Sequence, residues 1–185
     1  VLLRMAMEFD RRPEQYTDFE VTTWVSDYAR MMSTRNFTVG DAGGRIFGRV
    51  VTQWCMIDLT SRRPVDLTTP AVAATYGRYL VDAPSPADAP RRITSVAPQR
   101  ERSHEVVYSD IDFNRHVNTL RYLDMMLDML PIESFAGERA VRMDINFQRE
   151  CRYGQTLTIG HERRDACDLF EISAEGSPAV RAALE

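Results

Sequence analysis

Residues 108–130 read YSDIDFNRHVNTLRYLDMMLDML, and this stretch decides the fold of the second half of the chain. Apolar residues recur at helical spacing from Val117 to Leu130, and Pro131 stops the pattern. A polar run from Asp112 to Asn118 comes directly before the apolar stripe. The stretch therefore predicts a single long helix that follows a loop rich in polar side chains, and loops of this kind often carry function.

Alternating patterns after this helix predict an antiparallel sheet on which it rests. The odd-numbered residues from Val141 to Phe147 are apolar and the even-numbered ones are polar, which is typical of a half-buried strand. Similar patterns at 156–163, 168–174 and 179–184 predict three more strands. A short strand at 106–108 is expected to lead into the polar run.

The first 58 residues also have the pattern of antiparallel strands. Apolar residues alternate with others from Met5 to Phe9 and again from Phe19 to Val25. A longer run from Ile46 to Ile57 is rich in valine and other strand-forming residues. Gly40–Gly44 supplies the positive φ angles that a hairpin turn needs. We expect three or four antiparallel strands in this part of the chain.

Composition changes between Leu59 and Ser103, where six prolines occur. Proline cannot donate a hydrogen bond to a central sheet, so this stretch is predicted to be a connector. Thr69–Pro70 resembles a cap followed by a first-turn proline, which predicts a short helix reaching Leu80. The expected organisation is an N-terminal domain at 1–58, a linker at 59–103 and a C-terminal domain at 104–185 that carries the polar loop.

Composition excludes several classes of function. All 23 basic residues are arginine, so lysine-dependent chemistry, such as Schiff-base catalysis or a Walker phosphate loop, is excluded. A net charge of -4 argues against a nucleic-acid partner. No stretch approaches the roughly 18 apolar residues of a membrane span. The three cysteines lack metal-ligand spacing, so no metal is expected.

The cysteine count also bears on the compartment. Three is an odd number for a disulfide framework, which favours a reducing, cytoplasmic location. The sequence begins with Val1, inside an alternating pattern, so a targeting segment and a plastid location stay open.

The polar run places three reactive side chains at every second residue, namely Asp112, Asn114 and His116. In an extended segment this spacing puts all three on one side. Histidine exchanges protons near neutral pH, and an amide can stabilise a developing oxyanion together with backbone N–H groups at a helix start, expected near Asn118 or Thr119. Singly, each residue is more often a turn, cap or core residue. Their joint spacing favours a reaction centre.

A second acidic position, Glu150, follows the predicted strand ending at Phe147. The neighbouring Cys151 also allows a Cys-His-Asn nucleophile with His116 and Asn114. Adjacent strand residues face opposite sides, so both are not expected to reach His116 unless a bulge intervenes. We favour Glu150, because a carboxylate can activate water directly and Cys151 can equally be a small buried apolar side chain.

The run at 108–122 resembles the D-x-N-x-H-V-N signature of hot-dog thioesterases. Asn114 with Arg149–Cys151 narrows the resemblance to the acyl-acyl-carrier-protein thioesterases of plants and bacteria. The first half is similar to the same family at Trp24–Ser26, Gly48–Asp58 and Arg62–Arg63. The resemblance implies an α+β double hot-dog, in which two antiparallel sheets each wrap a long helix. The first repeat is then expected to lack its N-terminal strand and helix.

The resemblance also implies an activity, namely hydrolysis of fatty acyl-acyl-carrier-protein thioesters in fatty acid biosynthesis, with no cofactor. Carried over by position, the catalytic residues are Asp112, Asn114, His116 and Glu150, while Cys151 matches a cysteine once proposed as a nucleophile. A hot-dog thioesterase acting on acyl-coenzyme A remains an alternative, and so does a non-catalytic acyl-binding protein. A homodimer also stays open.

The implied partner, acyl carrier protein, is acidic in this family, so arginines are candidates for its docking surface. The candidates are Arg62–Arg63, Arg91–Arg92, Arg100 and Arg102. A solvated surface explains these residues equally well.

Overall fold

The computed structural model describes residues 1–137 and 139–185. They divide into two compact units, the first made of residues 1–91 and 139–144 and the second of residues 92–137 and 145–185. Strand β6 (Val141–Phe147) begins in the first unit and ends in the second. Glu150 and the polar run at 112–118 both belong to the second unit, so the candidate site can be described within one unit.

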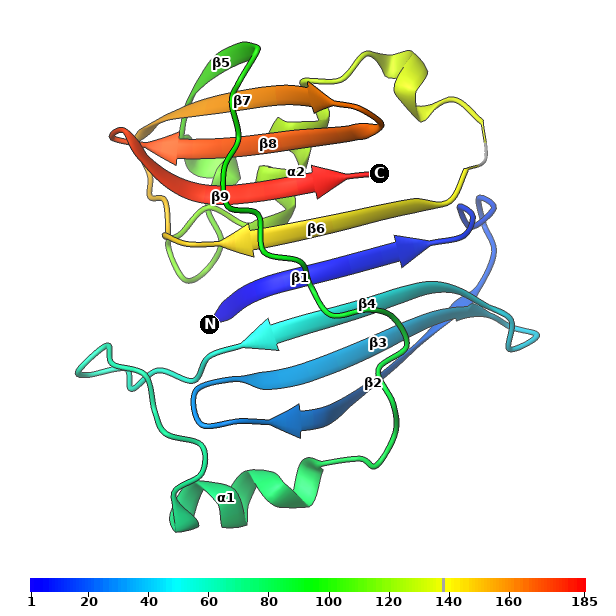
Figure 1. Ribbon diagram of the computed structural model, residues 1–185, viewed down its shortest axis with the longest axis vertical. Coiled ribbons are helices and arrows are strands. Elements are labelled where there is room, and N and C mark those ends of the chain that lie inside the picture. Colours follow the sequence, from blue (N-terminus) through cyan, green and yellow to red (C-terminus); the bar gives the residue numbers. More distant parts are fainter. Residues whose placement is uncertain (138) are drawn as a thin grey trace. The chain divides into compact units, whose positions relative to one another are not determined.

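The first unit is built on four consecutive antiparallel strands (Figure 1). They are β1 (Leu2–Phe9), β2 (Phe19–Tyr28), β3 (Ser33–Asp41) and β4 (Ile46–Trp54). Their spatial order is β2-β3-β4-β1, because β3 pairs with both β2 and β4 and β4 pairs with β1. The prediction of three or four antiparallel strands in this part of the chain is confirmed.

The glycine-rich turn between β3 and β4 also forms where it was predicted. The Asp41 carboxylate accepts hydrogen bonds from the N–H groups of Gly43 and Arg45, at 3.1 and 3.0 Å. Gly44 has a φ angle of 79°, a conformation that is favourable for glycine and costly for most other residues. Two features thus stabilise the turn: the hydrogen bonds to the Asp41 side chain and a glycine at the position with a positive φ angle.

A short helix follows the first sheet, as predicted. Helix α1 (Pro70–Tyr76) has Thr69 as its N-cap and Pro70 in its first turn, where the missing N–H of proline costs nothing. A 3-10 turn, η1 (Gly77–Tyr79), follows directly and extends the helical segment to the neighbourhood of Leu80.

The second unit is a sheet with one helix resting on it (Figure 1). Its strands are β5 (Arg100–Glu105), β7 (Thr156–Arg164), β8 (Cys167–Ala174), β9 (Ser177–Leu184) and the end of β6. Their order is β6-β9-β8-β7-β5, and the pairs β5–β7, β7–β8 and β8–β9 are antiparallel. The predictions of β6 to β9 are confirmed, apart from shifts of one or two residues at strand ends.

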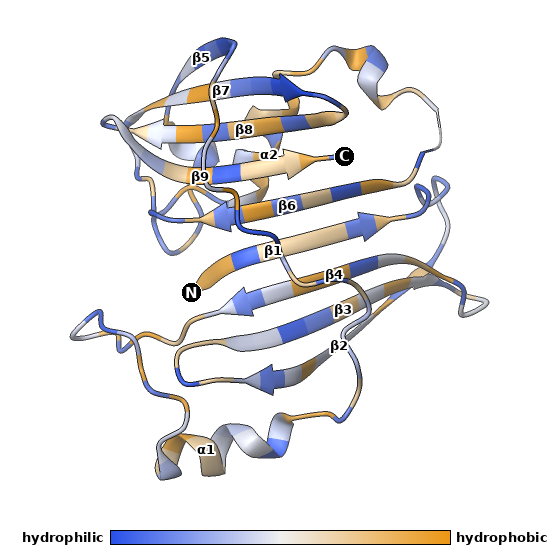
Figure 2. Cartoon of the chain, in the orientation of Figure 1, coloured by the Kyte–Doolittle hydropathy of each residue, from blue (hydrophilic) through white to orange (hydrophobic). Residues whose placement is uncertain are grey.

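Hydrophobic and hydrophilic residues alternate along β6 (Figure 2). Fully buried side chains from three strands, namely Leu157, Ile159, Phe170, Ile172 and Val180, form the core of the second unit. Helix α2 (Thr119–Leu127) buries Tyr122, Met125 and Met126 and contacts β7.

The strand predicted at 106–108 was placed wrongly, because the strand is β5 at Arg100–Glu105. Residues Tyr108–Asp110 instead form a 3-10 turn, η2. The Asp110 carboxylate accepts the N–H of Val107 at 2.9 Å, and the Asp110 N–H donates to the Val107 carbonyl at 3.1 Å. These two bonds satisfy the local backbone without a neighbouring strand.

Helix α2 is shorter than the predicted helix, which extended from Val117 to Leu130. Asn118 caps it and accepts the N–H of Leu120 at 2.9 Å, which sets the helix start at Thr119. The chain after Leu127 continues in tighter turns, since the N–H of Leu130 bonds the carbonyl three residues earlier, at 3.0 Å. The apolar stripe indicated burial, and Met129 and Leu130 are half-buried after the end of the α-helix.

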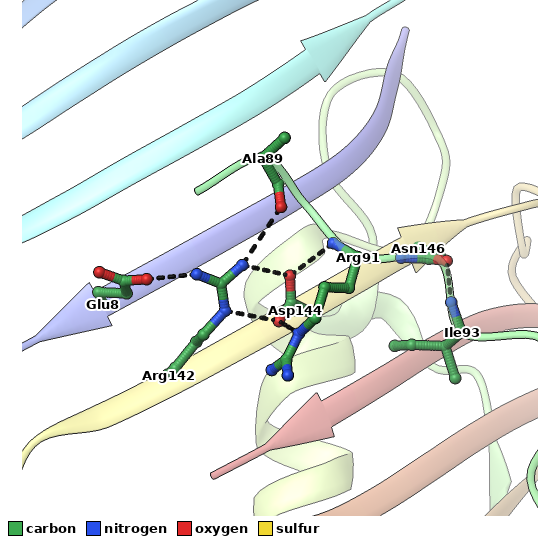
Figure 3. Close-up of polar contacts among 7 residues, drawn as sticks. All are labelled: Glu8, Ala89, Arg91, Ile93, Arg142, Asp144 and Asn146. Carbon is green, nitrogen blue, oxygen red and sulfur yellow. Dashed lines mark hydrogen bonds and ion pairs between the residues drawn. The ribbon is translucent and has the colours of Figure 1, made fainter. Parts of the chain in front are cut away.

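A buried carboxylate on β6 holds a later part of the predicted linker, at residues 89–91, in the first unit (Figure 3). Asp144 is fully buried and accepts the backbone N–H of Arg91 at 2.8 Å and its Nε at 2.7 Å. Arg142 donates to the same carboxylate from Nε at 2.9 Å and also pairs with Glu8. Burial opposes ionisation of Asp144, but the hydrogen bonds from Arg142 and Arg91 keep its pKa below the usual value.

Side chains of the second unit hold the next part of the predicted linker. Asn146 accepts the N–H of Ile93 at 2.9 Å (Figure 3). Glu162 accepts the N–H of Ala97 at 2.6 Å. Side-chain hydrogen bonds to the backbone thus fix a proline-rich segment that contributes no strand of its own before β5.

Candidate active site

Two of the predicted site residues, His116 and Glu150, lie in direct contact. Nε2 of His116 is 3.1 Å from Oε2 of Glu150, and the two side chains are 23% and 34% exposed. His116 lies in the loop before α2, and Glu150 lies three residues after the end of β6. The sequence placed them 34 positions apart, and the fold brings them together at a half-buried position that water can reach.

A backbone hydrogen bond beside this pair explains the contact. The N–H of Val117 donates to the carbonyl of Cys151 at 2.9 Å, so the residues that follow His116 and Glu150 are bonded to each other. The N–H of Cys151 in turn donates to the hydroxyl of Tyr122, on α2, at 3.2 Å. The backbone of Cys151 is therefore bonded on both sides.

The loop that carries His116 is a tight hairpin shaped by Asp112. The Asp112 carboxylate accepts the N–H of Asn114 at 2.8 Å and that of His116 at 3.4 Å, while its own N–H donates to the His116 carbonyl at 2.9 Å. Arg115, at the tip, has a φ angle of 64°. The described contacts of Asp112 are with the loop, whereas we expected this side chain to orient the imidazole or to act on water.

Asn114 lies exposed on the same hairpin. Its side-chain Nδ2 is 3.5 Å from Oδ2 of Asp112, at the outer limit of a hydrogen bond. The amide is therefore weakly held and can turn toward a carbonyl group that enters from solvent.

Three of the backbone N–H groups that we expected to polarise a carbonyl near Val117 are already engaged. The N–H of Val117 bonds the Cys151 carbonyl, that of Asn118 bonds the Asp110 carbonyl at 2.8 Å, and that of Leu120 bonds its cap. The expectation of free donors at these positions was wrong, because these N–H groups form the hydrogen bonds that close the loop and cap the helix. The Asn114 side chain is the predicted donor whose described hydrogen bond, at 3.5 Å, is the longest.

Sequence reasoning missed Asp110, which anchors the base of the hairpin. Its carboxylate is fully buried and accepts from Val107 N–H at 2.9 Å and from Arg121 Nε at 3.0 Å, and it lies 2.8 Å from Nε2 of His104. Burial opposes ionisation, but these three partners hold the pKa of Asp110 below its usual value. The available signal was a second aspartate two residues before Asp112, which is weak without a structure.

Cys151 is fully buried, and this position bears on the alternative in which it is the nucleophile. Burial raises the pKa of its thiol, although the nearby Tyr122 hydroxyl and the charge of Arg149 act in the opposite direction. A reactive cysteine needs a thiolate in an accessible, electropositive position. The environment of Cys151 favours a neutral thiol with a packing role.

Over residues 1–137 and 139–185, none of the helices combines the length and apolar character that a membrane crossing requires. Over the same residues, no group of three or more His, Cys, Asp or Glu side chains is arranged to hold a metal ion.

Two domains of one family match this chain. The N-terminal domain of acyl-ACP thioesterases matches residues 1–76, and the C-terminal domain matches residues 94–183. The crystal structure of an acyl-ACP thioesterase from Bacteroides thetaiotaomicron is similar, with a TM-score of 0.86 and 32% sequence identity over 100% of this chain and 74% of that chain. The 12:0-ACP thioesterase from Umbellularia californica, with a TM-score of 0.84 and 20% identity over 100% of this chain and 74% of that chain, shares the fold.

A chloroplastic acyl-[acyl-carrier-protein] hydrolase from Cuphea viscosissima is 26% identical over 162 residues, which are 85% of this chain and 39% of that protein. The chain thus spans less than half the length of this curated relative. The two domain matches and the Bacteroides structure together decide the family. This chain belongs to the acyl-acyl-carrier-protein thioesterase family.

Proposed function

We propose that this protein hydrolyses fatty acyl-acyl-carrier-protein thioesters to a free fatty acid and the carrier-protein thiol, as a step of fatty acid biosynthesis. The observation that carries the proposal is the contact of 3.1 Å between His116 and Glu150 in a chain of this family. Family membership supports a thioester substrate, and the contact supplies a carboxylate and an imidazole beside solvent, as water activation requires.

In the proposed reaction, Glu150 accepts a proton from water while the water oxygen attacks the thioester carbonyl carbon. His116 holds the carboxylate and the attacking water, and the Asn114 amide donates to the developing oxyanion. The tetrahedral intermediate then collapses, the carbon–sulfur bond breaks, and the sulfur leaves as a thiol after taking up the proton from Glu150. Asp112 acts by holding the hairpin in shape.

The proposed fold is a double hot-dog whose domains are 1–58, partial, and 104–185, joined by a linker at 59–103. Support comes from the α+β organisation of each unit and from the matches to an N-terminal and a C-terminal thioesterase domain. The second unit has the sheet and helix of one such domain, with α2 resting on β7.

The proposal is tested by presenting the same acyl group on acyl carrier protein and on coenzyme A and measuring free thiol and fatty acid. We expect faster release from the carrier protein, because charge complementarity accelerates the encounter of two proteins. Faster release from coenzyme A would favour the alternative hot-dog thioesterase. Tight acyl binding without release from either carrier would favour the non-catalytic alternative.

Replacement of Cys151 tests the competing nucleophile. We expect Cys151→Ser and Cys151→Ala to keep kcat within about threefold of the wild type, because both variants retain the backbone hydrogen bonds of Cys151 with Val117 and Tyr122 and change only the contact of its thiol with the Tyr122 hydroxyl. Both variants should be about 1–2 kcal/mol less stable than the wild type, because they remove a buried thiol. A loss of kcat beyond a hundredfold in both variants, with a normal Tm, would instead assign the thiol a covalent role.

Of the arginines predicted to dock the carrier protein, Arg62 and Arg63 are exposed, and the other four divide into two groups. Arg91 holds the buried Asp144, and Nη2 of Arg100 donates to the Met129 carbonyl at 3.0 Å, so both stabilise the fold. Arg92 and Arg102 are exposed and remain candidates for docking. A double Arg91→Ala and Arg92→Ala variant could not separate an effect on docking from a loss of stability. Arg92→Ala alone leaves the contacts of Asp144 intact.

A further inference from the structure

We propose that Tyr122 is a positioning residue, which holds Glu150 against His116 through the backbone of Cys151. This inference rests on the proposed function and adds a residue that positions the proposed base without touching the substrate. The Tyr122 hydroxyl accepts the Cys151 N–H at 3.2 Å, and Cys151 directly follows Glu150. The side chain of Tyr122 therefore holds the peptide group that joins the proposed base, Glu150, to Cys151.

Hydrogen bonds on both sides of Glu150 hold this part of the chain. The strand β6 ends at Phe147, and residues 148–152 have no regular secondary structure, but the N–H groups of Gln148 and Arg149 still donate to the Ala179 carbonyl of β9, at 2.8 and 3.2 Å. The carbonyl of Cys151 is held by Val117 and the N–H by Tyr122. Both supports come from the segment that begins with His116 and continues into α2, so the loop and the carboxylate are fixed to the same segment.

Tyr122 is suited to this task because it is rigidly placed. It is 5% exposed on α2, and it lies one turn after the cap residue Asn118. Burial, followed by the nearby Cys151 side chain, raises the pKa of its hydroxyl, so the group is neutral at physiological pH and can accept the N–H without bringing a second negative charge close to Glu150. Phenylalanine would keep the packing of the ring and remove the acceptor.

The test combines Tyr122→Phe with Glu150→Gln in a double-mutant cycle on acyl carrier protein substrate. We expect Tyr122→Phe to lower kcat by about 10- to 100-fold with KM within about twofold, since small misplacements of a catalytic group cost this much. In the Glu150→Gln background the same change should lower the residual rate by less than about twofold, because the carboxylate that it positions is gone. Tyr153→Phe, whose ring is 70% exposed, is the matched control and should match the wild type.

Crystal structures of the wild type and of Tyr122→Phe give a readout independent of turnover. We expect the separation of His116 Nε2 and Glu150 Oε2 to grow from 3.1 Å beyond hydrogen-bond reach, while Tm falls by roughly 2–8 °C from one unpaired buried N–H. An unchanged separation, or equal effects of Tyr122→Phe in the two backgrounds, would overturn the positioning role. Absence of hydrolysis by the wild type would overturn the proposed function instead, and the crystallographic separation would still decide the role of Tyr122.

Discussion

Glu150→Gln is expected to lower kcat for the acyl carrier protein substrate by about 10²- to 10⁴-fold, the range that general base catalysis supplies. Glutamine preserves the size of the side chain and its hydrogen bond to His116 but cannot accept a proton from water. KM should change little, because the carboxylate acts on the attacking water and not on the bound acyl group. Steady-state kinetics with a thiol-reactive reporter would measure both constants.

The control is Glu105→Gln, which removes a carboxylate from an exposed position on β5 in the same unit. This variant should keep the wild-type kcat, because the formal charge changes by the same amount at a position outside the site. His116→Ala is expected to be as damaging as Glu150→Gln, and the double variant little worse than either, since the pair acts as one group. Retention of more than a tenth of kcat in Glu150→Gln, with the fold intact, would remove this carboxylate from the role of base.

The sequence drew attention to the candidate site residues more clearly than to the contacts around them. Asp112, Asn114 and His116 were visible because their spacing before an apolar helix is unusual, and the end of a strand drew attention to Glu150. Asp110 and Tyr122 were missed because one resembles a turn residue and the other a core aromatic. Their roles depend on contacts with Arg121 and Cys151 that no short-range spacing encodes.

The same distinction explains which elements of the fold were predicted correctly. Strand β6 alternates strictly between apolar and polar residues, and this period is a local signal. The position of β5 was missed because its sequence, RERSHE, contains no apolar residue. Its place at the end of the strand order leaves most of its side chains exposed, so it needs no hydrophobic pattern. Hydrogen bonding to β7 makes this segment a strand.

Asp144→Asn is expected to cause a large loss of stability, about 3–5 kcal/mol in the free energy of unfolding. The change replaces the fully buried carboxylate, to which Arg91 and Arg142 donate hydrogen bonds, with an uncharged amide. The NH2 group of this amide is itself a donor, so it cannot accept from either arginine. Urea unfolding at pH 7, followed by circular dichroism, would measure the loss as a lower midpoint. Asp10→Asn is the control, because its pair with Arg49 lies at the surface, where Asp10 is 56% exposed, and should cost less than about 1 kcal/mol.

The pH dependence of this loss identifies the ionised carboxylate as its cause. The pKa of Asp144 is lowered in the folded protein, so its contribution is fully present above the ordinary value of 3.8 and is lost as the pH falls through the lower folded-state value. The difference in free energy between wild type and Asp144→Asn should therefore be constant from about pH 7 to pH 5 and shrink below about pH 4. A difference that stayed constant through the acidic range would mean that packing, and not charge, stabilises this part of β6. A difference no larger than that of Asp10→Asn would show that the two arginines find other partners once the carboxylate is gone.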